Sequence, residues 1–136
     1  MDPLRRQITD PQVVRLLKVV ERVNSLDREF PAQVLSTLLY IASHENCHKQ
    51  ALEEDLGMTT ASASRNTDWL SDKHRLGKPG LRLIIKEKDP TNRRKTQLRL
   101  TPKGKRLVAQ IKEDLYGIET PGVSGQEANE SNDQEL

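Results

Sequence analysis

Apolar side chains recur with a helical period along the first part of the chain. From Asp10 to about Leu26 they follow the i, i+3, i+4, i+7 spacing of an amphipathic helix, with Asp10 as the cap and Pro11 in the first turn. This stripe is wider than one helix face. It fits a helix that packs on its own domain and on a partner chain, and it fits equally a helix buried all round in a monomer. Its members are Val13, Val14, Leu16, Leu17, Val19, Val20, Val23 and Leu26.

Three further helices are predicted before the pattern changes. Pro31 opens the most apolar of them, which we expect to be the central core helix and to end around His44 to His48. The next is short and stops at Gly57, because glycine readily takes the left-handed conformation that ends many helices. Thr59 is a good N-cap for the last, expected from Thr60 to Asp72. Two helices joined by a glycine-containing turn of this length are typical of a helix-turn-helix.

Beyond the glycines at 77 and 80, the apolar period becomes two. Two short strands alternate around a turn signal at Asp89-Pro90, which predicts a hairpin with one apolar face. The apolar set of the strands is Leu81, Leu83, Ile85, Leu98 and Leu100. The tip of the hairpin has no apolar residue and carries Lys88, Arg93, Arg94 and Lys95. Thr101-Pro102 then caps a last helix that Gly117 ends. The fold class expected is mainly α with a small β-hairpin (α+β).

Composition makes the chain a small domain with a modest core. Its 136 residues are 34% hydrophobic and 31% charged. One cysteine excludes an internal disulfide and fits a reducing cytosol, and we expect Cys47 to be a plain surface cysteine rather than a redox sensor. The longest apolar run, 38–42, is too short to cross a bilayer, and no secretory signal is evident. We therefore expect a soluble cytoplasmic protein without membrane contact.

Charge is segregated along the chain. The net charge is +2, yet all 22 Lys and Arg lie within residues 1–116, and residues 117–136 hold five acids and no base. The segment 73–112 carries 14 bases against two acids. A basic concentration of this kind is the electrostatic footprint of a protein that binds a polyanion. The last 20 residues are polar and acidic, which predicts a disordered tail.

The helix that begins at Thr60 has an unusual composition. Ala63, Thr67 and Leu70 share one side of it, whereas Arg65 lies opposite and small hydroxyl side chains flank both. Small polar side chains with one arginine suit close approach to base edges and phosphates. The alternative is a surface helix made of weak helix formers. The weak helix propensity itself favours a functional interpretation.

A zinc-protease signature also occurs, at His44-Glu45-Asn46-Cys47-His48, which matches H-E-x-x-H. The match fixes three positions only, falls where a helix is expected to end, and has no companion motif for a third ligand. We therefore expect no catalytic residues, no metal site, no cofactor and no enzymatic activity.

The order helix, helix-turn-helix, basic hairpin, helix is that of a winged helix-turn-helix. At the level of residues, 31–116 resembles the MarR family of bacterial transcription regulators. Two stretches carry the resemblance: L-G-M-T-T-A-S-A-S-R-N-T-D-W-L from Leu56 to Leu70, and D-P-x-x-R-R…L-x-L-T-x-x-G from Asp89 to Gly104. The resemblance implies a homodimer on a near-palindromic site and a wing arginine, here Arg94, in the flanking minor groove. The family usually sets an aspartate two residues before that arginine, where this chain has Asn92.

The sequence thus favours a sequence-specific double-stranded DNA-binding regulator, a repressor acting as a homodimer. The alternative is a winged-helix module that binds proteins and reads no DNA sequence. The expected organisation is an N-terminal helix that contributes to dimerisation (1–30), the winged helix-turn-helix (31–116) and the tail (117–136). A small-molecule effector is left open. The DNA-contacting residues predicted are Thr60, Ser62, Ser64, Arg65, Arg93, Arg94 and Lys95, with Lys49, Lys86 and Lys88 as further phosphate contacts.

Overall fold

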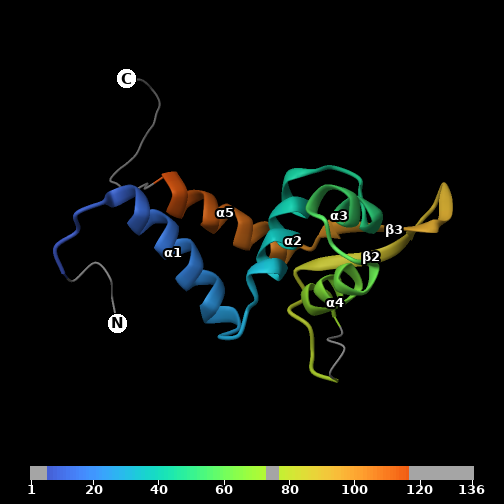
Figure 1. Cartoon of the computed structure of the whole chain (residues 1–136), viewed down its shortest axis with the longest axis horizontal. Coiled ribbons are helices and arrows are strands. Elements are labelled where there is room, and N and C mark those ends of the chain that lie inside the picture. The colour runs from blue at the N-terminus through green and yellow to red at the C-terminus, as the bar shows by residue number, and fades with distance from the viewer. Residues whose placement is uncertain (1–5, 73–76, 117–136) are drawn as a thin grey trace. The chain divides into compact units, whose positions relative to one another are not determined.

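The structure, a computed structural model, describes residues 6–72 and 77–116. The elements in these ranges are α1 (Pro11–Leu26), α2 (Ala32–Ser43), β1 (Cys47–His48), α3 (Lys49–Leu56), α4 (Thr60–Leu70), β2 (Ile84–Asp89), β3 (Asn92–Leu100) and α5 (Pro102–Tyr116) (Figure 1). The fold is therefore α+β, with the predicted order of helices and hairpin. The predicted tail and Gly117 lie outside the described residues. No helix of the described ranges has the length and apolar character that a membrane crossing needs.

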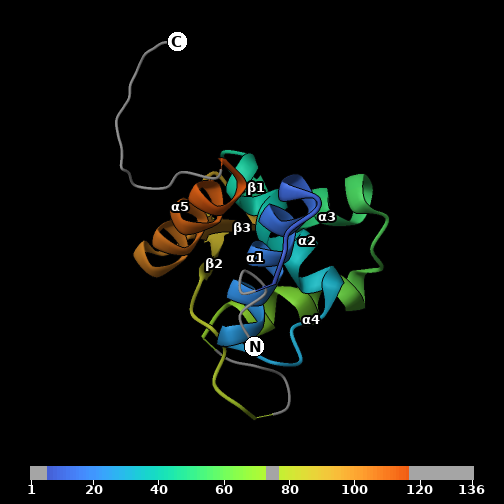
Figure 2. The ribbon, with the colours of Figure 1, turned by 90° about the vertical axis from the view of Figure 1, so that its left-hand side faces the viewer.

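The chain divides into two compact units. Unit 1 consists of Met1–Arg22 and Ala109–Leu136, and it includes most of α1 and the second half of α5. Unit 2 consists of Val23–Val108 and contains the helix-turn-helix and the hairpin. Within unit 2 the helices α2, α3 and α4 gather together in both views (Figures 1 and 2). Figure 1 shows that the tip of the β2–β3 hairpin extends away from them.

The core of unit 2 is built on α2, as the sequence predicts. Val34 and Leu38 of this helix are fully buried. The hydroxyl of Thr37, also buried, donates to the Gln33 carbonyl 2.8 Å away, so its polar atom is satisfied inside the helix. The elements α3, α4 and β3 each contribute one fully buried leucine, which are Leu52, Leu70 and Leu98 respectively.

The sheet has three antiparallel strands in the order β1-β3-β2. The predicted hairpin is confirmed, with Ile84 opposite Leu100 and Lys86 opposite Leu98. On its other edge β3 pairs with β1, where Cys47 is opposite Leu98. The strand β1 is not predicted by the sequence, because two residues are too few to show a period of two.

The start of the first hairpin strand differs from the prediction. The strand begins at Ile84, because Arg82 takes a left-handed φ of 57° and interrupts the extended backbone. Leu83 and Ile84 are both buried as a result, so the predicted alternation of Leu81, Leu83 and Ile85 is wrong. The kink places Leu83 so that its N–H donates to the Leu70 carbonyl at 2.7 Å and its carbonyl accepts from Thr101 N at 3.0 Å.

The predicted helix caps are confirmed. Asp10 Oδ1 accepts from the N–H of Val13 at 3.2 Å, and the Thr59 hydroxyl accepts from Ser62 N at 3.0 Å. Gly57 ends α3 with φ of 67°, the left-handed conformation. The bounds of two helices differ slightly from the prediction, since α2 begins one residue after Pro31 and α4 ends at Leu70 rather than at residue 72.

Gly104, the last residue of the L-T-x-x-G stretch, lies in the first turn of α5. A Cβ at this position would stand 2.1 Å from the Leu83 carbonyl oxygen, far inside van der Waals contact. The N–H of Gly104 donates to the Thr101 hydroxyl at 3.0 Å. Glycine is therefore required here because the helix packs directly on the backbone at the root of the hairpin.

Candidate nucleic-acid interface

The two sides of α4 differ in exposure as the sequence predicts. Its buried side consists of Ala63, Asn66, Thr67 and Leu70. Thr60, Ala61 and Arg65 are exposed, and Ser62 and Ser64 are half-buried beside them. The guanidinium of Arg65 donates to the Ser62 hydroxyl at 3.1 Å, one helical turn back. The outer side of α4 therefore presents short side chains, most of them polar, and one arginine, which leaves room for close approach.

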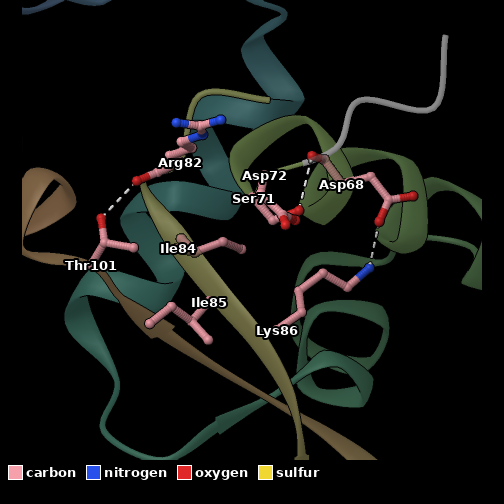
Figure 3. A pocket seen from close by; sticks show the side chains of 8 residues that line it. All are labelled: Asp68, Ser71, Asp72, Arg82, Ile84, Ile85, Lys86 and Thr101. Atoms are coloured by element: carbon pink, nitrogen blue, oxygen red, sulfur yellow. Dashed lines mark hydrogen bonds and ion pairs between the residues drawn. The ribbon is translucent and has the colours of Figure 1, made fainter. Parts of the chain in front are cut away.

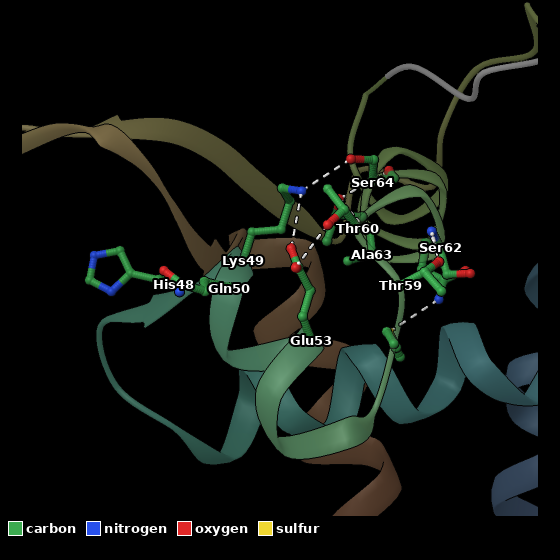
Figure 4. Close-up of polar contacts among 12 residues, drawn as sticks. His48, Lys49, Gln50, Glu53, Thr59, Thr60, Ser62, Ala63 and Ser64 are labelled. Atoms are coloured by element: carbon green, nitrogen blue, oxygen red, sulfur yellow. Dashed lines mark hydrogen bonds and ion pairs between the residues drawn. The ribbon is translucent and has the colours of Figure 1, made fainter.

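A chain of polar contacts joins this side of α4 to α3 (Figure 4). The ammonium of Lys49 donates to the Ser64 hydroxyl at 3.1 Å and lies 3.7 Å from the carboxylate of Glu53. The other oxygen of that carboxylate accepts from the Thr60 hydroxyl at 3.0 Å. The structure thus brings together three of the predicted residues around Glu53, which the sequence does not single out.

The turn of the hairpin, the wing, is organised by Asp89. Its Oδ1 accepts from both the N–H and the hydroxyl of Thr91 at 2.8 Å, and its Oδ2 lies 2.6 Å from His48 Nε2. The hydrogen bond from His48, together with those from Thr91, lowers the pKa of Asp89 from its ordinary value to about 2. The backbone at the wing tip is therefore fixed by a carboxylate that stays ionised at neutral pH.

Asn92 stands where a MarR-like pattern would carry aspartate, and its amide oxygen accepts from the backbone N–H of Arg94 at 3.2 Å. Asn92 therefore orients the backbone at Arg94. Within the described residues the side chains of Arg93, Arg94 and Lys95 have no hydrogen-bonding or ionic partner, and all three are exposed. Arg99, farther down the same strand, is held by Glu87 at 2.9 Å. Three neighbouring cations at the wing tip are thus free to bind a ligand.

A groove of about 260 Å³ lies between the start of α3 and the wing. Its lining joins three predicted phosphate and groove contacts, Lys49, Arg94 and Lys95, to His48, Gln50, Glu53 and Thr96. Because Lys49 also contacts Ser64, the basic wing, the start of α3 and the outer side of α4 form one continuous surface.

Lys86 occupies a different place from the other predicted cations. Its ammonium donates to Asp68 Oδ1 at 2.7 Å, beside a cleft of about 460 Å³ between the end of α4 and β2 (Figure 3). Ile84 and Ile85 form the apolar part of the cleft lining, and Arg82 and Asp72 contribute charge. Lys86 would have to leave this ion pair to contact a phosphate.

The zinc-protease signature has no helical geometry. His44 follows the end of α2, Asn46 takes a φ of 54° in a turn, and His48 lies in β1, so the two histidines do not share a helix face. His44 Nδ1 contacts the Tyr40 carbonyl at 2.9 Å, and His48 contacts Asp89. Among the described residues, no group of three or more His, Cys, Asp or Glu side chains is placed to hold a metal ion.

Cys47 is not the surface cysteine that the sequence predicts. It is 3% exposed, because β1 packs it under β3 opposite Leu98. Burial raises the pKa of the Cys47 thiol to about 11, and the charge of Asp55 adds to the shift. A thiol in this environment is protonated at neutral pH and is a poor nucleophile.

No family model and no curated protein matches the chain. Solved structures do match. A MarR transcriptional regulator from Methanosarcina mazei Go1 gives a TM-score of 0.58 at 15% identity, over 79% of this chain and 70% of that one. The S. aureus MepR-DNA complex gives a TM-score of 0.58 at 18% identity, over 79% of this chain and 86% of that one. A MarR-like regulator from Thermotoga maritima gives a TM-score of 0.52 at 24% identity, over 85% of this chain and 77% of that one. The chain thus has the MarR-like winged helix-turn-helix fold.

Proposed function

We propose that this chain is a sequence-specific, double-stranded DNA-binding transcription regulator, in which α4 enters the major groove and the wing contacts the adjacent backbone and minor groove. The observation that carries the proposal is the continuity of the surface. Lys49 hydrogen-bonds to Ser64 on α4 and also lines the groove with Arg94 and Lys95 of the wing. A duplex laid along this surface meets short polar side chains where base edges would lie and cations where phosphates would lie.

The free side chains of the wing suit the grooves and backbone of DNA. Arg93, Arg94 and Lys95 lie at the end of a hairpin whose turn is fixed by Asp89 and Asn92. An arginine side chain on a backbone fixed in this way fits a narrow, A·T-rich minor groove, where the negative potential is concentrated. Lys88 is exposed on the other strand, and we propose that it contacts a phosphate only.

Solved relatives of the same fold support the assignment to transcription. The S. aureus MepR structure is described as a DNA complex, and the similar proteins from Methanosarcina mazei and Thermotoga maritima are described as transcriptional regulators. On this basis we propose a cytoplasmic repressor that acts by occupying its site, with binding rather than chemistry as its activity.

Unit 1 supports a homodimer. Val13 and Leu16 of α1 are 60% and 58% exposed. Leu17 and Val20 belong to the same helical stripe, and their side chains are less exposed. The end of α5 exposes Leu115 and Tyr116. Apolar side chains gathered at helical spacing on a surface are typical of a protein interface. Two copies joined through residues 1–30 and the end of α5 would present two recognition helices to half-sites about 10–10.5 base pairs apart.

Selection of binding sites from random duplexes tests the proposal. We expect enrichment of a near-palindromic sequence, and we expect the logarithm of the affinity to fall with the logarithm of salt concentration by about 0.9 for each neutralised phosphate. Affinity that is flat with salt contradicts the phosphate contacts. If no sequence is enriched, the alternative of a winged-helix module that binds proteins is favoured instead.

A further inference from the structure

Among the described residues, Glu53 is the one carboxylate that contacts predicted DNA-contacting residues of α3 and α4. Its two oxygens engage the Thr60 hydroxyl at 3.0 Å and the Lys49 ammonium at 3.7 Å, and Lys49 in turn contacts Ser64 (Figure 4). The side chains of Lys49 and Glu53 are 18% and 26% exposed, so the pair is half-buried and still open to a ligand. The negative charge of Glu53 therefore faces the same polyanion, a DNA duplex, that the cations around it would attract.

The chemistry of a carboxylate limits what it can meet on a duplex. An ionised carboxylate only accepts hydrogen bonds, and phosphate oxygens only accept them too, so Glu53 repels the backbone. In the major groove, hydrogen-bond donors are the exocyclic amino groups of cytosine and adenine, and carboxylates are the usual partners of cytosine N4. The Thr60 hydroxyl leaves lone pairs of the carboxylate unused, because each oxygen accepts more than one hydrogen bond.

From these contacts we infer that Glu53 is a specificity-determining residue of the DNA interface: it suppresses non-specific binding and accepts a hydrogen bond from a cytosine amino group in the cognate site. The inference rests on the proposed function. On random DNA, Glu53 holds Lys49 away from phosphates and adds its own repulsion. On the cognate site, the amino group satisfies the carboxylate, and Lys49 keeps its hydrogen bond to Ser64 while its charge becomes available to a neighbouring phosphate.

Glu53→Gln tests the inference, because the amide keeps the shape of the side chain and an oxygen for Thr60 but removes the charge. We expect the variant to bind random duplexes more tightly, and its salt dependence on random DNA to steepen by about 0.9, since Lys49 becomes free to neutralise one further phosphate. The ratio of cognate to random affinity is expected to fall about tenfold, the effect of one base contact. The selected consensus should lose its preference for cytosine at one position in each half-site.

Glu54→Gln is the matched control. Glu54 is the next residue of the same helix, is exposed, and contacts Gln50 rather than α4. The Glu54→Gln substitution changes the net charge by the same amount as Glu53→Gln, so it measures the general effect of charge on DNA affinity. In the double variant Lys49→Met, Glu53→Gln, the additional salt dependence should disappear. Melting temperatures of all variants verify that they fold.

The outcomes separate the inference from the function on which it rests. If the wild-type protein selects a site and Glu53→Gln keeps the same specificity ratio, the inference is wrong and the proposed function stands. Equal gains of random affinity in Glu53→Gln and Glu54→Gln likewise overturn it, because they show a general charge effect. A wild-type protein that binds no duplex overturns the proposed function and the inference together.

Discussion

His48 Nε2 lies 2.6 Å from Asp89 Oδ2, and this contact ties the short strand β1 to the turn of the wing. Asp89 also accepts two hydrogen bonds from Thr91. The side chains of His48 and Asp89 are 27% and 13% exposed, so the pair is largely covered at the wall of the groove that Lys49 and Arg94 line. The Asp89 carboxylate therefore adds a side-chain contact to the pairing of β1 with β3 that positions the wing relative to α3.

Replacement of Asp89 should make the stability depend less on pH. The folded protein lowers the pKa of Asp89 to about 2, against about 3.9 in an unfolded chain. The stabilisation is therefore complete above about pH 4 and is lost as the pH falls towards 2. We expect Asp89→Asn to melt below the wild-type protein at neutral pH and most of the difference to be lost by about pH 2, where the Asp89 carboxyl is half protonated, measured by thermal unfolding.

Glu87→Gln is the control for Asp89→Asn. Glu87 lies two residues earlier on β2 and pairs with Arg99 on an exposed part of the hairpin. Exposed ion pairs contribute little, about 0–1 kcal/mol. A melting difference for Asp89→Asn that persists unchanged at pH 2 contradicts the role of the ionised carboxylate.

The Arg22–Asp114 contact should contribute to the stability of unit 1. Arg22 Nε lies 2.6 Å from Asp114 Oδ2 and a terminal guanidinium nitrogen lies 3.0 Å from Oδ1, a two-pronged contact between α1 and α5. The hydrogen bond from Arg22 lowers the pKa of Asp114. Arg22→Lys keeps the charge but cannot make the second hydrogen bond of the bidentate pair. We therefore expect a loss of about 1 kcal/mol in the free energy of unfolding, measured with denaturant.

Arg15→Lys on the same helix serves as the comparison for Arg22→Lys, because Arg15 has no hydrogen-bonding or ionic partner among the described residues. It should change the unfolding free energy by less than Arg22→Lys does. Equal losses of unfolding free energy in the two variants would show that the bidentate hydrogen bonding of Arg22 to Asp114 is unimportant for stability.

Arg65 and Lys88 should affect DNA binding in different ways. Arg65 lies on the outer side of α4, whereas Lys88 lies on β2 at the wing. We expect Arg65→Ala to lose about 1–3 kcal/mol on the cognate site and to relax the base preference at one position. Lys88→Ala should weaken binding to all duplexes alike and reduce the salt slope by about 0.9. Affinities for cognate and scrambled duplexes measure both, and an identical loss in the two variants on every sequence would contradict the assignment.

A charge on the exposed stripe of α1 should dissociate the proposed homodimer. Leu16→Glu places a carboxylate in a face that would be buried between two copies, where an unpaired charge is strongly unfavourable. We expect the sedimentation coefficient to fall from the dimer to the monomer value. Leu39→Glu is the matched variant, since Leu39 is 40% exposed on α2 in unit 2 and should leave the coefficient unchanged. A wild-type protein that already sediments as a monomer contradicts the proposal.

The helices and their caps could be predicted because the signals are local. The stripe of α1, the Thr59 cap and the left-handed Gly57 each depend on residues within one or two turns. The hairpin was predicted for the same reason, from its alternation and the Asp89-Pro90 turn. Its root was predicted wrongly because a single φ, that of Arg82, changes which side chains point inward, and no sequence period records it.

The exposure of the candidate site residues on α4 could be predicted, but the contacts that connect these residues could not. The exposed side of α4 follows from helical geometry alone. The partners of these residues do not: Glu53 meets Thr60 across the crossing of α3 and α4, and His48 meets Asp89 from a distant part of the chain. Such contacts are set by the packing of elements, which local propensity does not determine. The burial of Cys47 was missed because it depends on the pairing of β1 with β3.

Leu83 joins the C-terminal end of α4 and the N-terminal end of α5 through its own N–H and carbonyl, while Gly104 lets the helix lie against that carbonyl. Helix α4 and the root of the hairpin are thus fixed relative to each other in the protein alone. Little backbone entropy remains to be lost when DNA binds, since the two elements need no ordering. The heat-capacity change of association should accordingly be that of docking two preformed surfaces, without the larger negative value of folding coupled to binding.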